Sequence, residues 1–558
     1  MNTKLKWLAC LILACLNTSI AEAIRLKTAT KSTALYQQVE YILACDRSVD
    51  NPFTERSVQG VFEHESGNTL VVDGFCDSSN GMEYKLRFLP CETGTYNYRI
   101  TVDQASGKKS FSGKLKVAPS SLKGVIRVDT AYPSHFIWDG TGEHYFWNGT
   151  TAYWLMGWKD EATIHSSIDR LARLGINRIR VAISGRQDDG QRWFEPLVKE
   201  SADFTFKLNP WVAQDPESLD NPGFDVSRFN IPYWQKLDRL VAYAQERGVV
   251  ISLVFYVDGL EHGCDPFQKA RMGGADEKRY YEYAVARYSS YNNIMWDVAN
   301  EYHLFRTEAW VKEMGEYLYS IDPYKHLISV HGHAAFPFRM EPWVNMVLYQ
   351  SWDECGGFEF MTQCRKLQNQ TGRILPQINE EYGYEGHYPP WGCGPEATKD
   401  MGGRSADNRR QLAWEIYMAG GYQTTGERAD EGTGAGNDTG GGWINGRGND
   451  SMVMLRGYAI IRNTFEQLEY WKLQPMPELV NYGNLCLAEP GKQYLVYSRI
   501  QHCRLQLPPD QRYSVLMINA STGEQLDLGW IDYKKANNAW QYPKELKGDW
   551  AFILKRME

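Results

Sequence analysis

NIMWDVANEY, residues 293–302, is a short apolar run that ends in the polar pair Asn300 and Glu301. Its length and composition predict one buried β-strand, with the pair at the C-terminal end of that strand. In a parallel β/α barrel, the C-terminal ends of the strands form the face at which reactive side chains gather. We therefore expect Glu301 to lie at the mouth of such a barrel.

A second stretch of the same kind, ILPQINEEYG at residues 374–383, places Glu380 and Glu381 at the end of another strand. Side chains alternate along a strand, so Glu381 shares a face with Gln377 and Asn379, whereas Glu380 shares the face of the apolar residues. The apolar face suits the helix layer, which turns Glu381 inward and Glu380 outward. Strand ends assigned from sequence shift by about one residue, so Glu380 stays an alternative to Glu381.

Two carboxylates on separate strands that face one barrel mouth are the groups that glycoside hydrolysis requires. The same alternation along residues 177–183 allows Arg180 to point toward them. The sequence therefore favours an enzyme that cleaves glycosidic bonds in a polysaccharide or oligosaccharide.

The rest of the chain predicts a multidomain α/β protein in three parts after a short leader. Residues 24–120 show short alternating segments broken by turns, which is typical of an immunoglobulin-like β-sandwich. Residues 121–471 repeat a strand, a loop and an amphipathic helix, with eight strand candidates, as expected for a (β/α)₈ TIM barrel. In residues 472–558 the period of two returns, which predicts a small antiparallel β-sandwich.

Composition excludes some partners. The formal net charge of -8 offers no basic face for nucleic acid. The glycine-rich run at residues 432–448 lacks the Gly-Lys-Ser/Thr of a phosphate loop, so we expect a loop over the barrel mouth and no cofactor.

Residues 1–23 have the pattern of a signal peptide. Lys4 and Lys6 precede an apolar run at residues 7–16, and Ala-Glu-Ala at residues 21–23 suits a cleavage site. The run is too short to span a bilayer, and no later stretch is long and apolar enough to do so. We expect export to the periplasm or the medium, with lipid attachment at Cys15 as the rival interpretation.

The predicted export would place the mature chain in an oxidising compartment, where disulfides persist. Nine of the 11 cysteines follow the leader. Two close pairs, Cys355 with Cys364 and Cys486 with Cys503, are candidates for disulfides.

The motifs resemble those of clan A retaining glycoside hydrolases. WDVANEY at residues 296–302 resembles their fourth-strand motif, in which the Glu after Asn is the general acid/base, and Glu381 with the following Tyr-Gly resembles their seventh-strand nucleophile motif. Arg180 matches the second-strand Arg that holds the nucleophile, and Tyr349 matches the Tyr after strand six. FWNGTTA at residues 146–152 and Tyr-Glu-Gly at residues 384–386 look closest to the apiosidase-like group, which often carries a β-sandwich before the barrel and a small β-domain after it.

The resemblance implies double displacement, with Glu381 as nucleophile, Glu301 as acid/base and Asn300 bound to the sugar 2-hydroxyl. The charge of Arg180 should lower the pKa of Glu381. Apiosidases carry an Asp on strand four, where this chain has Asn300 and Glu301, so apiose specificity is not implied.

Other residues of the predicted mouth are candidates for substrate contact. They are Trp154, His331, His333, Glu385 and Glu427. His331 and His333 share a strand face and could ligate zinc in a metal-dependent amidohydrolase, but no second His pair supports that class, so we expect no metal. A barrel that binds carbohydrate without cleaving it is the other alternative.

Overall fold

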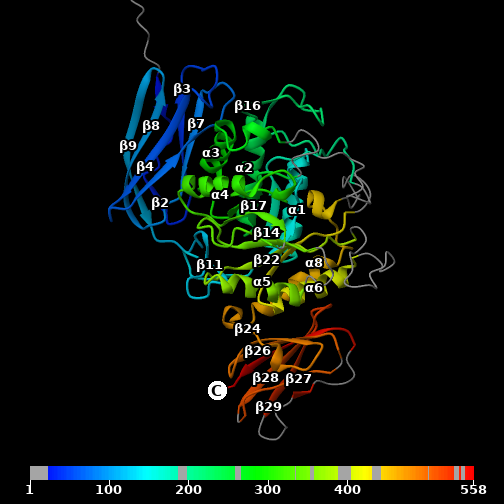
Figure 1. Cartoon of the computed structure of the whole chain (residues 1–558). Helices are drawn as coiled ribbons and strands as arrows, with labels where there is room; N and C mark the ends of the chain where they lie inside the picture. Colours follow the sequence, from blue (N-terminus) through cyan, green and yellow to red (C-terminus); the bar gives the residue numbers. More distant parts are fainter. Residues whose placement is uncertain are drawn as a thin grey trace, which may run out of the picture.

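The structure is a computed structural model that describes residues 23–186, 198–257, 265–333, 335–351, 357–386, 404–429, 441–500, 502–509, 511–532, 540–541 and 547–557. Figure 1 shows two β-rich parts on opposite sides of a central barrel, the N-terminal one in blue and the C-terminal one in red. The predicted signal peptide lies outside the described residues, apart from Ala23.

The N-terminal part is a β-sandwich of two sheets, as predicted. One sheet has the order β1 (Ile24–Leu26), β3 (Val39–Cys45), β7 (Glu83–Phe88) and β6 (Phe75–Cys76). The other has the order β2 (Ser32–Ala34), β9 (Gly107–Ala118), β8 (Gly94–Gln104), β4 (Arg56–His64) and β5 (Thr69–Asp73). Alternate residues of β4 are buried, because one face of each sheet packs on the other.

The central part is a parallel barrel, also as predicted. Its strands are β13 (Asn148–Thr151), β14 (Arg178–Ala182), β17 (Val250–Val254), β18 (Ile294–Asp297), β19 (Ile328–Ser329), β20 (His331–His333), β21 (Val347–Gln350), β22 (Gln377–Glu381) and β23 (Tyr422–Thr425). They form one nine-stranded sheet that starts at β19 and ends at β20. Only Val330 separates β19 from β20, so these two strands are halves of one barrel position and close the barrel with eight positions.

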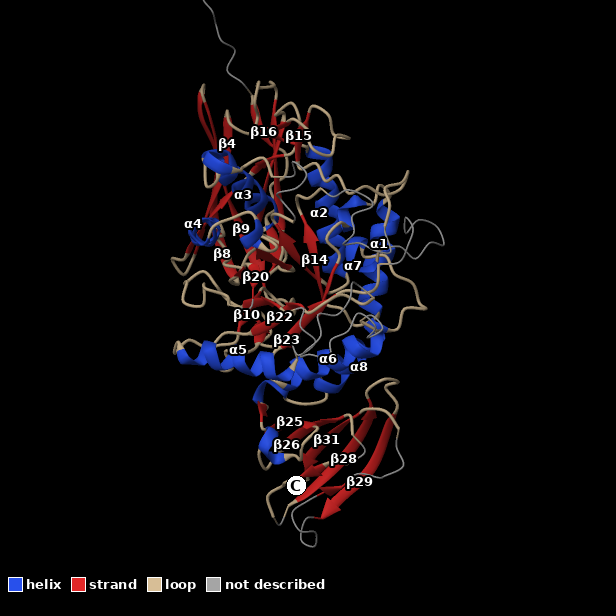
Figure 2. Ribbon diagram, turned by 45° about the vertical axis from the view of Figure 1, so that its right-hand side comes forward, coloured by secondary structure: helices blue, strands red, loops and turns tan. Residues whose placement is uncertain are grey.

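Helices surround the strands (Figure 2). They are α1 (Glu161–Arg173), α2 (Ile231–Glu246), α3 (Ala275–Tyr288), α4 (Glu308–Ile321), α5 (Phe358–Gln370), α6 (Ala406–Met418), the short α7 (Gly442–Asn445) and α8 (Met454–Phe465). The described residues between β20 and β21, 335–346, form turns where the sequence pattern predicted another barrel helix. The buried ring of Trp343 packs there so closely that a Cβ on Gly315 of α4 would lie 2.4 Å from it.

Shorter strands flank the barrel. A three-stranded antiparallel sheet of β10 (Ile126–Val128), β11 (Phe136–Trp138) and β12 (His144–Tyr145) precedes β13, and a hairpin of β15 (Trp211–Ala213) and β16 (Phe224–Phe229) follows β14.

The C-terminal part is an antiparallel β-domain, as predicted. Its main sheet has the order β24 (Gln474–Pro475), β25 (Asn484–Glu489), β26 (Gln493–Ser498), β31 (Trp550–Arg556), β28 (Arg512–Asn519) and β29 (Gln525–Asp532), and β27 (Arg504–Leu505) pairs with β30 (Trp540–Gln541). Tyr497 of β26 stacks on Trp414 of α6, with ring centroids 4.9 Å apart. This contact joins the domain to the barrel.

The predicted disulfides are not seen in the described part of the chain. Cys364, Cys486 and Cys503 are free thiols, which is contrary to the predicted Cys486–Cys503 pair. Cys355 lies outside the described residues. Across the described ranges, no helix has the length and apolar character needed to cross a bilayer.

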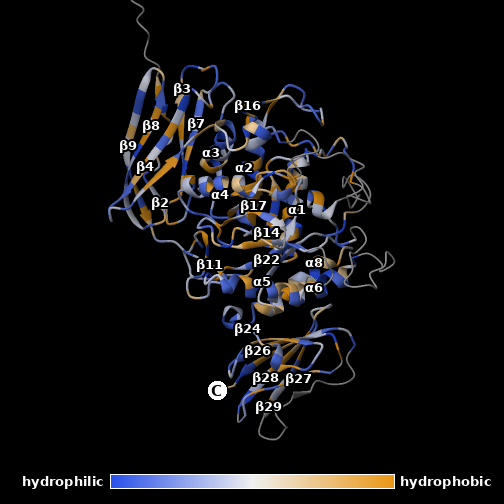
Figure 3. Cartoon of the chain, in the orientation of Figure 1, coloured by the Kyte–Doolittle hydropathy of each residue, from blue (hydrophilic) through white to orange (hydrophobic). Residues whose placement is uncertain are grey.

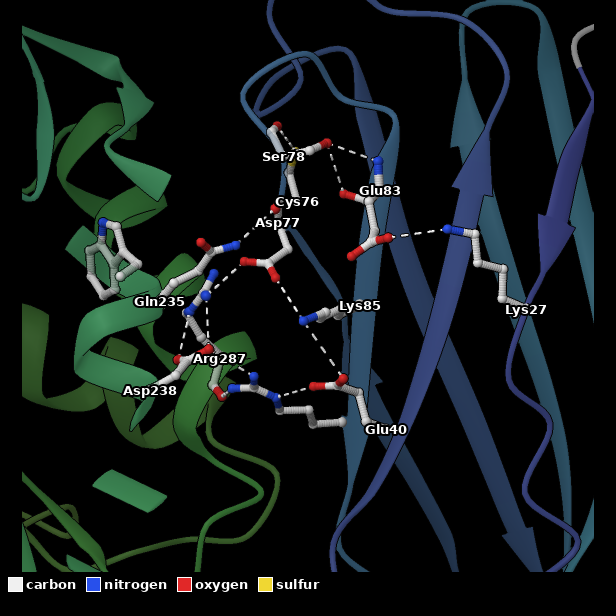
Figure 4. A network of polar contacts seen from close by, with 12 residues as sticks. Lys27, Glu40, Cys76, Asp77, Ser78, Glu83, Lys85, Gln235, Asp238 and Arg287 are labelled. Carbon is white, nitrogen blue, oxygen red and sulfur yellow. Dashed lines mark hydrogen bonds and ion pairs between the residues drawn. The ribbon is translucent and has the colours of Figure 1, made fainter. Parts of the chain in front are cut away.

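Buried ion pairs fasten the N-terminal sandwich to the barrel (Figure 4). Arg287 of α3 lies 2.7 Å from Asp77 of the sandwich and 2.8 Å from Asp238 of α2. Lys85 of β7 lies 2.8 Å from Asp77 on its other side. The Arg287 side chain is completely buried and is shared by both carboxylates, so its loss would leave Asp77 with Lys85 and Asp238 with Arg87 as the remaining charged partners described.

We expect Arg287→Met to lower the free energy of unfolding by about 3 to 5 kcal/mol, because Asp77 and Asp238 would lose a buried partner. Lys27→Met is the control, since Lys27 and Glu83 form a largely exposed pair in the same network. That change should cost less than about 1 kcal/mol. Denaturant unfolding measures both, and equal losses would contradict this account of the interface.

Candidate active site

The end of β18 turns sharply at Glu301. The Asn300 N–H donates to the carbonyl of Tyr256 at 2.9 Å, which continues the parallel pairing beyond the strand. Glu301 then adopts φ 44° and ψ 47°, a left-handed conformation that costs a side chain about 1 to 2 kcal/mol. Its Oε1 accepts a hydrogen bond from Gln350 Nε2 of β21 at 2.9 Å. The turn thus brings the Glu301 carboxylate toward the end of a second strand.

Glu381, the last residue of β22, lies in the same place. The Tyr153 hydroxyl donates to its Oε2 at 3.2 Å. Arg180 Nη1 lies 3.9 Å and His331 Nε2 lies 4.0 Å from that oxygen. The end of β22 is fixed to β21 by a hydrogen bond of 2.9 Å from the Ser351 N–H to the Glu381 carbonyl.

Asn300, Arg180 and Tyr153 connect the two carboxylates. Asn300 Oδ1 accepts from Arg180 Nη2 at 3.0 Å and lies 2.9 Å from the Tyr153 hydroxyl. That hydroxyl also accepts from Arg180 Nη1 at 2.6 Å. The structure therefore brings together Glu301, Glu381, Asn300, Arg180 and His331 from the predicted set.

The predicted orientation of Glu380 is wrong. Between β21 and β22 the register shifts, so that Tyr349 pairs with Asn379 but Gln350 pairs with Glu381. Glu380 is the extra residue, and its Oε1 lies 2.5 Å from Arg178 and 3.0 Å from Arg180. Because of this bulge, two consecutive side chains point into the barrel instead of alternating.

Tyr349 is not brought into this group. Its hydroxyl donates to Gln377 Oε1 at 2.5 Å, and its ring lies edge-on to Phe360 of α5 with centroids 5.7 Å apart. The side chain therefore lies against the helix layer. Its neighbour Gln350 faces Glu301 instead, as alternation along β21 requires.

Two further candidates, Trp154 and Glu427, have partners other than the two carboxylates. Trp154 is buried, with its ring centroid 5.4 Å from that of Phe206. Both oxygens of Glu427 accept from Arg170 of α1, at 2.6 and 2.7 Å.

Glu385 Oε2 accepts from the Arg428 N–H at 3.1 Å. The side chain of His333 and most of the glycine-rich loop, residues 430–440, lie outside the described part.

Sequence reasoning missed four residues at or beside the site: Tyr153, Gln350, Tyr384 and Trp443. The Tyr384 hydroxyl donates to that of Tyr153 at 3.3 Å, and its ring stacks on Trp443 with centroids 4.1 Å apart. Gln350 at a strand end was a usable signal, because strand ends line the mouth. Tyr153 lies in a turn and Trp443 in the four-residue helix α7, and neither segment is long enough for periodicity to carry information.

The electrostatics of Glu381 differ from the expectation. Burial, together with the charge of Glu301, raises the pKa of Glu381 to about 8, and the opposing effects of Arg180, Tyr384 and Tyr153 are smaller. Arg180 does lower the pKa of Glu381, as predicted, but burial and the charge of Glu301 raise that pKa by more. Two carboxyl groups that interact in this way lose their protons in steps that belong to the pair. Near neutral pH, the pair thus retains a proton.

This environment predicts that Glu381→Gln stabilises the protein. A carboxyl group whose folded pKa lies above its unfolded value of about 4.3 destabilises the fold above that pH, fully so above the folded pKa. We expect the variant to gain about 2 to 4 kcal/mol at pH 7 and almost nothing near pH 4. Denaturant unfolding at both pH values tests this prediction. If the free energy of unfolding differed between variant and wild type by the same amount at pH 4 and pH 7, the prediction would be wrong.

The described residues hold no group of three or more His, Cys, Asp or Glu side chains arranged for a metal ion. His331, a candidate zinc ligand in the sequence, lies beside Glu381, with its Nε2 4.0 Å from the carboxylate.

Solved structures share this architecture. A putative glycoside hydrolase from Bacteroides vulgatus ATCC 8482 is 20% identical, with a TM-score of 0.71 over 95% of this chain and 100% of the other. A glycoside hydrolase family 5 structure from the same organism is 14% identical, with a TM-score of 0.57 over 78% of this chain and 94% of the other. None of the curated proteins compared with the chain matches it significantly. The barrel therefore has a glycoside hydrolase-like fold.

Two family models match the sequence. Residues 32–103, within the sandwich, match a domain of unknown function named DUF5060. Residues 133–426 match the model described as apiosidase-like, catalytic domain, and they make up more than half of the chain. The chain belongs to this apiosidase-like family.

Proposed function

We propose that the protein is a retaining glycoside hydrolase that uses Glu381 as nucleophile and Glu301 as general acid/base. The observation that carries the proposal is that these two carboxylates, from the ends of β18 and β22, are joined by one chain of hydrogen bonds. Tyr153 contacts Glu381, Asn300 contacts Glu301, and Tyr153 and Asn300 contact each other. This arrangement supplies the two carboxyl groups that cleavage with retention requires.

In the first step, a Glu381 oxygen forms a bond to the anomeric carbon while the bond to the leaving oxygen breaks. Glu301 gives its proton to that oxygen. In the second step, water attacks the anomeric carbon, Glu301 takes a proton from the water, and the ester to Glu381 breaks. The sugar leaves with its original anomeric configuration, and both carboxyl groups return to their starting states.

The neighbours have roles that follow from their contacts. Arg180 and the Tyr153 hydroxyl stabilise the ionised Glu381 and hold its Oε2 in place. Asn300, which lies beside Glu301, would hydrogen-bond the 2-hydroxyl of the sugar. Gln350 orients Glu301 through its amide N–H. The raised pKa of Glu381 supports a site that starts each cycle with one proton on the pair.

The substrate class is carbohydrate, in oligosaccharide or polysaccharide form, and the reaction needs no cofactor. The leader at residues 1–23 supports export to the periplasm or the medium, with lipid attachment at Cys15 as the alternative.

An activity screen tests this function. Wild-type protein is incubated with aryl glycosides and with a panel of plant and algal polysaccharides, and released sugar is measured with and without a chelator. We expect hydrolysis of at least one substrate, insensitive to chelation. Binding without hydrolysis would favour the non-catalytic barrel, and activity lost on chelation would favour a metal-dependent hydrolase at His331 and His333.

A further inference from the structure

Four charged side chains lie inside the barrel beneath the Glu301–Glu381 pair. They are Arg178 and Arg180 of β14, Asp297 of β18 and Glu380 of β22, and all four side chains are completely buried. Glu380 Oε1 contacts Arg178 Nη2 at 2.5 Å and Arg180 Nε at 3.0 Å. Asp297 Oδ2 contacts Arg180 Nη2 at 3.1 Å. We name these four residues the interior charge cluster.

Arg180 links this cluster to the site. Its guanidinium group is planar and offers donors in fixed directions. With Nε at Glu380 and Nη2 at Asp297, the remaining Nη1 is directed to the Tyr153 hydroxyl at 2.6 Å and lies 3.9 Å from Glu381. By holding Nε, Glu380 therefore determines that Nη1 is the Arg180 nitrogen directed toward Glu381.

The cluster is also balanced in charge, with two guanidinium groups and two carboxylates. Arg178 completes its contacts with the hydroxyls of Ser252 and Thr424 and lies over the Trp147 ring, so Glu380 is its anionic partner among the described residues. Without Glu380, the cluster would carry an uncompensated positive charge, and Arg180, one of its members, lies 3.9 Å from Glu381. In a buried site, such a charge acts strongly, because little solvent screens it.

We propose that Glu380 is a positioning residue, which orients Arg180 and offsets the charge of Arg178 so that the Glu301–Glu381 pair keeps its proton. This inference rests on the proposed glycosidase function. The sequence pattern left Glu380 as an alternative nucleophile. Its burial beneath the pair, with both guanidinium groups as partners, supports the positioning role instead.

Among the described residues, titratable side chains beside Glu381 on other elements include Tyr153, His331 and Tyr384, and none of them changes in the test. An excess positive charge favours the doubly ionised pair, so the proton is lost at a lower pH. Loss of that proton ends general acid catalysis and sets the alkaline limb of the pH–rate profile.

The test compares Glu380→Gln, Arg178→Gln and the double variant by the pH dependence of kcat/KM on one cleaved substrate. We expect Glu380→Gln to move the alkaline limb to lower pH by about one unit or more, and Arg178→Gln to move it to higher pH. The double variant removes one charge of each sign, so its limb should return to within about 0.3 unit of wild type. We also expect kcat of Glu380→Gln to fall by about 10- to 100-fold, since Arg180 loses its orientation.

Asp238→Asn is the matched control, because Asp238 is also a carboxylate held by two arginines, Arg87 and Arg287, but at the domain interface. It should lower thermal stability and leave the limb in place. If Glu380→Gln does not fold, two results still decide the question: the shift of Arg178→Gln to higher pH, and the return of the limb toward the wild-type position in the double variant. Limbs that coincide in every active variant would overturn the inference while leaving the glycosidase function intact. Absence of hydrolysis by wild-type protein would overturn both.

Discussion

Replacing Glu381 by alanine is expected to abolish turnover on every substrate that the wild-type protein cleaves. Glu381 lies at the end of β22 among Tyr153, Arg180 and His331, and none of these can form the glycosyl ester in its place. Loss of a catalytic nucleophile typically lowers kcat by about 10⁴- to 10⁶-fold. Initial rates on an aryl glycoside with a good leaving group measure the effect.

Glu63→Ala is a suitable control, because Glu63 is an exposed residue of β4 in the N-terminal sandwich. Its rate should equal that of wild type. Substantial residual activity in Glu381→Ala, above about one per cent, would assign the nucleophile to another residue.

Replacing Glu301 by alanine should affect substrates unequally. A substrate whose leaving group needs a proton should be cleaved about 10²- to 10⁴-fold more slowly, because general acid catalysis is lost. An aryl glycoside with an activated phenol needs no proton, so its first step should be nearly as fast as in wild type. The ester to Glu381 would then accumulate, because no base activates water in the second step.

Added azide should rescue this variant, because it attacks the ester without a general base and gives a glycosyl azide of retained configuration. The rate of azide product and its configuration by proton NMR are the readouts. Rescue of Glu381→Ala with an inverted product, and no rescue of Glu301→Ala, would mean that the two roles are reversed.

The sequence predicted the three-part fold because the pattern of apolar and polar residues changes at each boundary between parts. Alternation by two marks both β-domains, and the strand–helix repeat marks the barrel. It also brought Asn300, Glu301, Arg180 and Glu381 to one place, because barrel strand ends must meet at one face. The sequence pattern did not predict that the described residues between β20 and β21 form turns instead of a helix. There the ring of Trp343 packs against Gly315 of α4, and a contact between residues so far apart in the sequence leaves no local pattern.

The errors at the site have separate physical origins. A β-bulge at Glu380 breaks strict alternation, so alternation predicts the helix layer for a side chain that points into the barrel. Tyr349 was expected at the site from the family resemblance, but its side chain lies against the helix layer. Tyr153 meets Asn300 and Glu381 over separations of 147 and 228 residues, which no local pattern encodes. The direction of the Glu381 pKa also needed the structure, because burial outweighs the adjacent Arg180.

Mass spectrometry of Glu301→Ala after brief incubation with a cleaved aryl glycoside tests the central claim most directly. Double displacement predicts that the protein mass rises by one glycosyl unit, and that peptide mapping places this unit on Glu381. A glycosyl unit on Glu380, or no adduct together with an initial product of inverted configuration, would contradict the account.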